Sequence, residues 1–126
     1  MKVLILNENK AILKLIETSL EEDDHQIISC SNALIMTELI KTHQPALIIM
    51  DLLISYMTGV EVIKLIRSMP PPYIKVIVLS SVKLEGAVVE CFEQGVDDYI
   101  EMPLRLEELK ARMARLDRYT IKALSN

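Results

Sequence analysis

The stretch that decides the fold is Pro45-Ala46-Leu47-Ile48-Ile49-Met50-Asp51, an apolar run that ends at an aspartate. Residues 46–50 carry no polar side chain, which is typical of a strand buried on both faces of a parallel sheet. A carboxylate at the end of such a strand is partly desolvated and needs a partner, and a hard cation with oxygen ligands is the usual one. The sequence therefore predicts a central strand that ends at a chemically important carboxylate, Asp51.

Four further strands are predicted around this one, with amphipathic segments between them. The five strand candidates are residues 3–6, 26–30, 46–50, 74–79 and 98–100. Apolar residues at helical spacing lie between and after them: Ile12, Ile16 and Leu20; Ile35, Leu39 and Ile40; Val62, Ile63 and Ile66; Leu84, Val88 and Phe92; and Leu106, Leu109, Met113 and Leu116. This alternation predicts a single α/β domain with a parallel sheet, right-handed connections and helices on both faces.

Local signals mark where several of these helices begin and end. Asn9 is placed to cap the first helix, and Thr58 with Glu61 has the spacing of a capping box before the third. The prolines at 70–72 must end the third helix, and Gly95 lies where the fourth should finish. The predicted helix ends therefore agree with the predicted strand positions.

Composition excludes several classes of protein. The chain has 126 residues, enough for one domain, and 51% of them are hydrophobic, which excludes a largely disordered chain. A net charge of -4 and the absence of Trp argue against direct binding of nucleic acid. Two isolated cysteines, Cys30 and Cys91, are expected as buried thiols of a cytoplasmic protein. No apolar run approaches the roughly 20 residues that cross a membrane.

Polar residues follow the predicted strands at their carboxyl ends, where sites form in parallel sheets. They are Asn7, Glu8, Asp51, Ser80, Ser81 and Glu101. Neither His25 nor His43 is expected at this edge, so Ser80 lacks a nearby general base and a hydrolase triad is not available. We therefore expect a protein that is not an enzyme.

Five stretches at matching intervals, 2–9 (KVLILNEN), 45–51 (PALIIMD), 57–61 (MTGVE), 76–81 (VIVLSS) and 95–103 (GVDDYIEMP), together resemble the receiver domain of bacterial two-component response regulators. The resemblance covers residues 2 to about 118. It implies a flavodoxin-like (βα)5 doubly wound sheet with strand order 2-1-3-4-5. It also implies a receiver domain over residues 1–120, with residues 121–126 as a C-terminal tail or the start of a linker. Gly59 matches the glycine that lets the loop after the third strand pack beside the site.

The resemblance also implies a role for each matching residue of the site. Asp51 matches the aspartate that accepts a phosphoryl group from a histidine kinase. Glu8 and Asp51, with the backbone carbonyl of Leu53, match the ligands of the Mg²⁺ that this transfer requires. Ser80 and Tyr99 match the hydroxyl and aromatic pair that rearranges upon phosphorylation.

Two residues depart from the family's pattern. Asn7 stands where the family has the first of two acidic residues, so Glu8 must hold the metal with Asn7 as an additional candidate ligand. Met102 stands where the family has a lysine that contacts the phosphoryl oxygens, and a thioether carries no charge and donates no hydrogen bond. Loss of one such donor costs about 3 to 4 kcal/mol, or roughly 10² to 10³ in rate. We expect weak or absent phosphorylation of Asp51 and signalling through protein contacts.

Two alternatives stay open at this point. Within the family, a conventional Mg²⁺-dependent receiver that is switched by a histidine kinase would have to tolerate Met102. From a different class, a flavodoxin-like module that binds a small ligand would need a glycine-containing phosphate loop after residue 6, and the residues there contain no glycine.

Charge is distributed unevenly along the chain and predicts a protein partner. Residues 105–126 hold six Lys and Arg against three Asp and Glu, whereas residues 1–104 hold eight against fifteen. Basic side chains on the last helix are expected opposite acidic ones on the fourth: Arg112, Arg115, Arg118 and Lys122 opposite Glu85, Glu90 and Glu93. This favours a homodimer through residues 84–118, beside a histidine kinase or other signalling protein as partner, without direct nucleic-acid or membrane contact.

Overall fold

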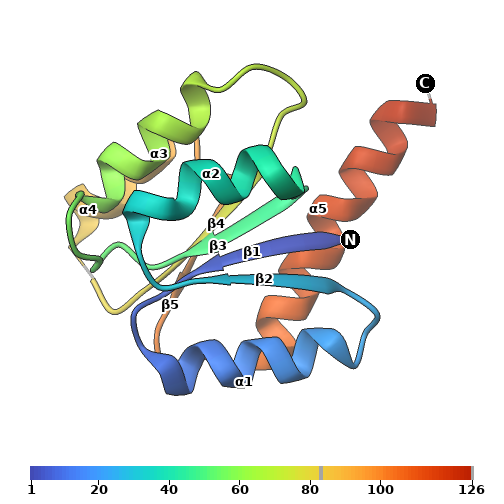
Figure 1. The fold of residues 1–126 in the computed structure, drawn as a ribbon, viewed down its shortest axis with the longest axis horizontal. Coiled ribbons are helices and arrows are strands. Elements are labelled where there is room, and N and C mark those ends of the chain that lie inside the picture. Colours follow the sequence, from blue (N-terminus) through green and yellow to red (C-terminus); the bar gives the residue numbers. More distant parts are fainter. Residues whose placement is uncertain (83, 126) are drawn as a thin grey trace.

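The chain forms a five-stranded parallel sheet in the order β2-β1-β3-β4-β5, with helices on both faces (Figure 1). The computed structural model describes residues 1–82 and 84–125, and of residues 118–125 the backbone alone. The strands are β1 Lys2–Leu6, β2 Gln26–Cys30, β3 Leu47–Met50, β4 Lys75–Ser80 and β5 Asp98–Glu101. The helices are α1 Lys10–Glu21, α2 Ala33–His43, α3 Gly59–Ser68, α4 Glu85–Glu93 and α5 Leu106–Ser125. The predicted flavodoxin-like single-domain fold and its strand order are confirmed.

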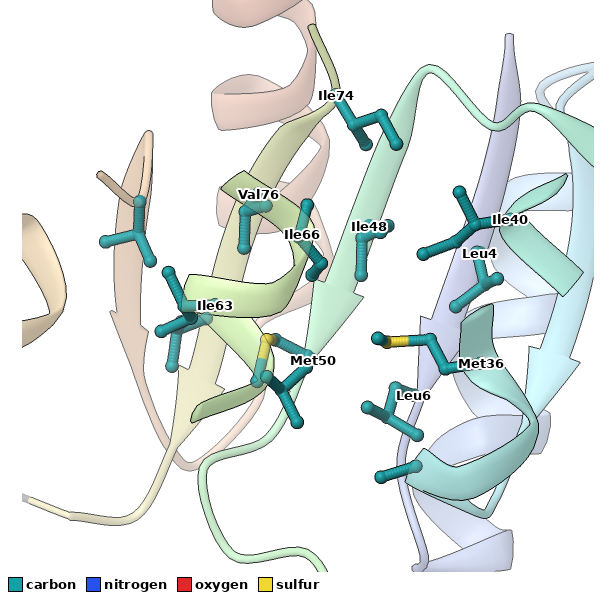
Figure 2. Close-up of a cluster of buried hydrophobic side chains, with 14 of the residues drawn as sticks. Leu4, Leu6, Met36, Ile40, Ile48, Met50, Ile63, Ile66, Ile74 and Val76 are labelled. Carbon is teal, nitrogen blue, oxygen red and sulfur yellow. The ribbon is translucent and has the colours of Figure 1, made fainter. Parts of the chain in front are cut away.

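The sheet separates two layers of buried aliphatic side chains. Alternate residues of each strand point to opposite faces, so β1 gives Leu4 and Leu6 to one layer and Val3 and Ile5 to the other. The first layer lies under α2, α3 and α4, and Figure 2 shows Met36, Ile63 and their neighbours packed over the strands. The second layer lies under α1 and α5. Each buried Leu or Ile contributes roughly 1.5 to 3 kcal/mol, so these layers are the main source of stability.

Most predicted helix ends are confirmed by their hydrogen bonds. The Asn9 side chain accepts from the backbone N–H groups of Ala11 and Ile12 and caps α1. Thr58 and Glu61 form the capping box of α3, which ends before the prolines. Gly95 follows α4 with a φ of 97°, which suits a glycine. The predicted domain boundary at residue 120 falls within α5, whose backbone stays helical to Ser125, so that boundary stays a prediction.

The predicted core faces of two helices are wrong in part. Ile35 is 48% exposed, because α2 turns Ala33, Met36 and Ile40 toward the sheet instead. In the predicted row of α4, Val88 packs against the buried layer, whereas Leu84 is 74% exposed and Phe92 is 48% exposed. Leu84 is the N-cap and lies before the helix begins, and Cys91 is the residue of α4 that is buried. An apolar face is therefore left on the surface of α4.

Ion pairs between α5 and β5 change the predicted role of two arginines. Asp98 is buried and accepts from Arg112 at 2.8 Å and from Arg115 at 3.1 Å. The pairing with Asp98 raises the pKa of Arg112. Both arginines are therefore already paired within their own chain rather than free to face α4 of a second copy, while the side chains of Arg118 and Lys122 lie outside the described residues.

Cys30 and Cys91 are both buried, and burial raises the pKa of each thiol, as expected of structural cysteines. Within residues 1–82 and 84–125, no helix combines the length and the apolar character needed to cross a membrane.

Candidate functional site

Strand register brings the predicted polar residues to one edge of the sheet. Leu6 pairs with Met50, and Met50 pairs with Val78, so β1, β3 and β4 end close together. Asp51 continues this pairing for one residue, since its N–H donates to the Leu6 carbonyl at 3.1 Å. His25 precedes β2 and His43 ends α2, so both lie at the opposite edge, as predicted.

Asp51 lies half-buried at this edge. One carboxylate oxygen accepts from the N–H of Leu53 at 3.0 Å. Burial raises the pKa of Asp51, the backbone N–H groups of Leu53 and Leu52 act in the opposite direction, and the charge of Glu8 raises it further. None of the ion pairs found among the described residues involves Asp51. The carboxylate is therefore held in place by backbone groups, and a cation would favour its ionised form.

Asn7 and Glu8 connect the end of β1 to two neighbouring segments. Asn7 is only 4% exposed, and its side-chain oxygen accepts from the N–H of Asn9 at 2.8 Å. Glu8 is exposed, and its carboxylate accepts from the backbone N–H of Ser55 in the β3–α3 loop. Asn7 thus orders the start of α1 and brings no charge, whereas Glu8 brings the second carboxylate of the site.

The β3–α3 loop packs closely against the start of α3. A Cβ atom at Gly59 would lie 2.5 Å from the Leu52 Cδ2 atom and 2.8 Å from the Leu52 Cα atom. The loop also holds Tyr56 at a φ of 77°, in the left-handed region, with 72% of the residue exposed. The structure thus supports the close approach expected at Gly59. The left-handed conformation of Tyr56 was not predicted, because no local motif marks such a conformation at an aromatic residue.

An open hollow of about 780 Å³ lies along this loop. It is named the β3–α3 hollow here and is lined by Glu8, residues 52–58 and Glu61. Leu53 and Tyr56 are exposed at its rim, whereas Leu52, Ile54 and Met57 also pack against the buried layer below. Sequence reasoning missed this hollow, because it depends on how one loop packs against another.

Ser80 and Tyr99 meet at one residue of the β4–α4 loop. The fully buried Ser80 hydroxyl oxygen accepts from the Val82 N–H at 3.0 Å. The Tyr99 hydroxyl donates to the Val82 carbonyl at 2.6 Å, and Tyr99 is 8% exposed. Burial raises the pKa of Tyr99, while the Ser80 hydroxyl acts in the opposite direction. The predicted pair is thus joined through the peptide groups of Val82.

Met102 packs against the apolar layer under α1 and α5 instead of offering a charge to the site. It is half-buried, and Leu104 packs beside it on the same layer. Its backbone N–H donates to the Ser80 carbonyl at 2.9 Å, which places Met102 next to the end of β4. The residue thus lies at the predicted edge with a side chain that can neither neutralise nor donate to an anion.

The donor set at this edge suits Mg²⁺. Glu8 is near enough for its charge to raise the pKa of Asp51. Mg²⁺ is commonly held by one or two carboxylates with several waters, so two carboxylates are sufficient. Among the described residues no cluster of three or more His, Cys, Asp or Glu side chains gathers as a metal site. Leu53 meets Asp51 through its N–H, so the metal-binding role of its carbonyl stays a prediction.

Fold and edge together define a class of protein: a flavodoxin-like domain with an acidic site at the end of β3 and a hydroxyl-aromatic pair on β4 and β5. The chain belongs to the response regulator receiver domain family, whose model matches residues 3–114. It is a receiver domain of two-component response regulators. Members of this family act in signalling, typically bind Mg²⁺ at the phosphorylation site, and interact with histidine kinases and other signalling proteins.

Similar proteins agree with this family. The chain is 29% identical over 126 residues to the alkaline phosphatase synthesis transcriptional regulatory protein PhoP of Bacillus subtilis, covering 99% of this chain and 52% of PhoP. It is 28% identical over 117 residues to the transcriptional regulatory protein KdpE of Staphylococcus aureus, covering 93% of this chain and 50% of KdpE. The chain thus spans about half the length of these curated relatives.

Solved structures show the same fold. The Francisella response regulator 1452 receiver domain is 28% identical with a TM-score of 0.86, over 94% of this chain and 98% of that one. A two-component response regulator from Clostridium difficile has a TM-score of 0.89 at 24% identity, over 94% of this chain and 96% of that one.

Proposed function

We propose that this receiver domain carries Asp51 in the phosphoacceptor position, is phosphorylated weakly or not at all, and signals through contacts with other proteins. The observation that carries the proposal is the position of Met102. Its side chain packs on an apolar layer beside the site and brings no positive charge to it. Asn7 adds to this, because its side chain is neutral and bonded to Asn9.

Glu8 and Asp51, with the carbonyl of Leu53 and Asn7 as further candidates, would hold Mg²⁺. When bound, the ion would supply positive charge near the acceptor oxygen of Asp51. The chain's own backbone orients the two carboxylates. The N–H of Leu53 donates to one carboxylate oxygen of Asp51, and the N–H of Ser55 donates to Glu8. Both contacts fix the direction of the carboxylates before any metal or phosphoryl group arrives.

Phosphoryl transfer develops negative charge on the transferred oxygens, and preorganised cations and donors near them lower the barrier. The thioether of Met102 is neither a cation nor a hydrogen-bond donor. Loss of one such donor raises the barrier by about 3 to 4 kcal/mol, or roughly 10²- to 10³-fold in rate. Ser80, Val82 and Tyr99 remain connected by hydrogen bonds. The chain thus keeps the predicted switch residues while it lacks one part of the predicted transfer chemistry.

The test is the intact mass of the protein during incubation with Mg²⁺ and a small phosphodonor such as acetyl phosphate. We expect the wild-type protein to gain a phosphoryl group at least about 10²-fold more slowly than the Met102→Lys variant. Asp51→Asn should remove the adduct from both. Equal rates for the wild type and Met102→Lys would instead establish the conventional phosphoacceptor receiver and overturn the proposal.

Partners follow from the same proposal. A histidine kinase or another signalling protein would contact the Asp51 edge, and a second copy of the chain is the further candidate through residues 84–118. The homodimer would use the apolar side chains that α4 leaves exposed, Val89 and Phe92, rather than the arginines already paired with Asp98. The receiver would then transmit its signal by changing which protein it contacts, without a chemical reaction of its own.

A further inference from the structure

The β3–α3 hollow joins apolar and acidic groups at the border of the Asp51 site. Leu53 is 61% exposed and Tyr56 is 72% exposed, so two large apolar side chains lie at the surface along the hollow. The two side chains of the hollow that carry a charge at neutral pH are glutamates, Glu8 and Glu61. Such a surface is complementary to a segment that combines apolar residues with a positive charge.

Tyr56 combines an exposed ring with a left-handed backbone conformation. A residue other than glycine in the left-handed region is strained, and this strain persists only where the surroundings enforce it. The conformation carries the aromatic ring outward at the rim of the hollow. An exposed aromatic face binds lysine and arginine side chains favourably, and it supplies apolar contact area at a low cost in side-chain entropy.

Neither glutamate of the hollow has an ion-pair partner among the described side chains. Glu8 accepts from the N–H of Ser55, and Glu61 accepts from the N–H of Thr58. Both contacts are to neutral backbone groups, so both negative charges remain available to a ligand. Glu8 is also the carboxylate whose charge reaches Asp51, which connects the hollow to the phosphoacceptor position.

We propose that the β3–α3 hollow docks a segment of a partner protein that presents one lysine or arginine between apolar residues. That basic side chain is held by Glu8 and Glu61 in the metal-free protein, and Mg²⁺ competes with it because Glu8 is also a candidate ligand of the ion. The inference rests on the proposed function, since it names the kind of partner through which this receiver signals. Docking would therefore place a partner protein at the border of the Asp51 site.

The first test measures binding of two short peptides by backbone NMR shifts of the full chain. One is acetyl-Leu-Ala-Arg-Leu-Ala-amide, and the other carries citrulline, a neutral isostere, in place of arginine. We expect shifts at Glu8 and residues 52–58, with the arginine peptide bound on the order of 5-fold more tightly, as one screened ion pair allows. Equal binding of the two peptides, shifts confined to other surfaces, or no binding at all would overturn the inference.

Matched variants separate charge from shape. Glu8→Gln keeps an acceptor for the Ser55 N–H, and Glu61→Gln keeps a residue that serves in a capping box. Each should lower the preference for arginine over citrulline, whereas Glu38→Gln, on the exposed side of α2, should leave it unchanged. Tyr56→Gly should weaken both peptides. Retention of the full preference in Glu8→Gln together with Glu61→Gln would contradict the proposed contact.

A second readout is competition with Mg²⁺. Because Glu8 is also a candidate ligand of the ion, Mg²⁺ should weaken binding of the arginine peptide more than binding of the citrulline peptide, and Glu8→Gln should reduce this difference. An equal effect of Mg²⁺ on the two peptides would contradict the contact with Glu8. Rapid phosphorylation without peptide would overturn the proposed function alone, because peptide binding is measured independently of it.

Discussion

Asp51 holds its carboxyl group where burial and the charge of Glu8 both favour the protonated form. The backbone N–H groups of Leu53 and Leu52 offset part of this effect, because they donate to the carboxylate. The residue is therefore poised to gain from a cation, whether a metal ion or a basic side chain. The lysine that the family resemblance leads us to expect at position 102 would compensate the charge of Asp51 within the chain, whereas the thioether of Met102 carries no charge.

Replacement of Asp51 by asparagine should stabilise the protein in a pH-dependent way. Because the pKa of Asp51 is raised in the folded state, ionisation costs stability as pH rises through that raised pKa, and the cost vanishes below the pKa of the unfolded chain. Urea unfolding should show Asp51→Asn gaining stability over the wild type from acid toward neutral pH. An advantage that is largest in acid would contradict the prediction.

Tyr56 is a second residue whose replacement should stabilise the protein. Glycine adopts a φ of 77° without strain, and the ring of Tyr56 is mostly exposed and loses little contact when removed. Tyr56→Gly should therefore raise the free energy of unfolding by about 0.5 to 1 kcal/mol. Tyr56→Ala keeps the Cβ atom and serves as the control, with a smaller gain expected. A destabilised glycine variant would show that the ring makes a structural contribution.

Among the elements, the β3–α3 loop and helix α3 depend on each other. Gly59 lets Leu52 approach the start of the helix, and the capping box of Thr58 and Glu61 fixes the first turn. The same segment forms the lining of the β3–α3 hollow. The geometry of the hollow is therefore tied to the packing of one glycine.

Gly59→Ala should destabilise the protein by about 1 to 3 kcal/mol, because the new methyl group would overlap the backbone and side chain of Leu52. Gly86, in the first turn of α4, is the matched control, since nothing lies within 4 Å of a Cβ atom built there. Gly86→Ala should stabilise by up to about 1 kcal/mol through helix propensity. Chemical denaturation measures both, and equal effects at the two glycines would contradict the argument.

Local signals in the sequence predicted the elements well and their exposed faces less well. Capping side chains such as Asn9 act on backbone groups two or three residues away, so sequence alone locates them. The buried face of α4 depends instead on where a nine-residue helix rests on the sheet. Leu84 and Phe92 were therefore assigned to the core wrongly, whereas Val88 was assigned correctly. Tyr56 escaped prediction because its conformation is imposed by the surrounding loop rather than by its neighbours in sequence.

For the whole molecule, the strand pattern predicted a parallel sheet, and the family resemblance supplied its strand order. Runs that are apolar almost throughout identified β1, β3 and β4 as the central strands, and the parallel arrangement brings Asn7, Glu8, Asp51 and Ser80 to one edge. The strand pattern could not predict ion pairs between side chains of distant elements, such as the pair of Arg112 with Asp98. The proposed homodimer must therefore depend on apolar surface more than on those arginines.

The exposed apolar side chains of α4 predict that the chain self-associates. If residues 84–118 form a homodimer, its contact includes Phe92, which is 48% exposed on α4. Sedimentation velocity over a range of concentrations should show a dimer, and Phe92→Ser should weaken it by about tenfold or more, as expected of an interface anchor. Leu15→Ser, which removes an equally exposed apolar side chain from α1, should leave it intact. A concentration-independent monomer would contradict the prediction.

The packing of Met102 has a consequence for how this protein could change by mutation. Methionine and lysine codons, ATG and AAG, differ by one base. Met102 lies half-buried on an apolar layer at the edge of the sheet, where a lysine could lay its aliphatic stem on the same layer and extend its ammonium outward. Neither the genetic code nor the fold therefore keeps lysine out of position 102. If Met102 causes the slow phosphorylation proposed for this domain, a change of one base would restore the missing positive charge.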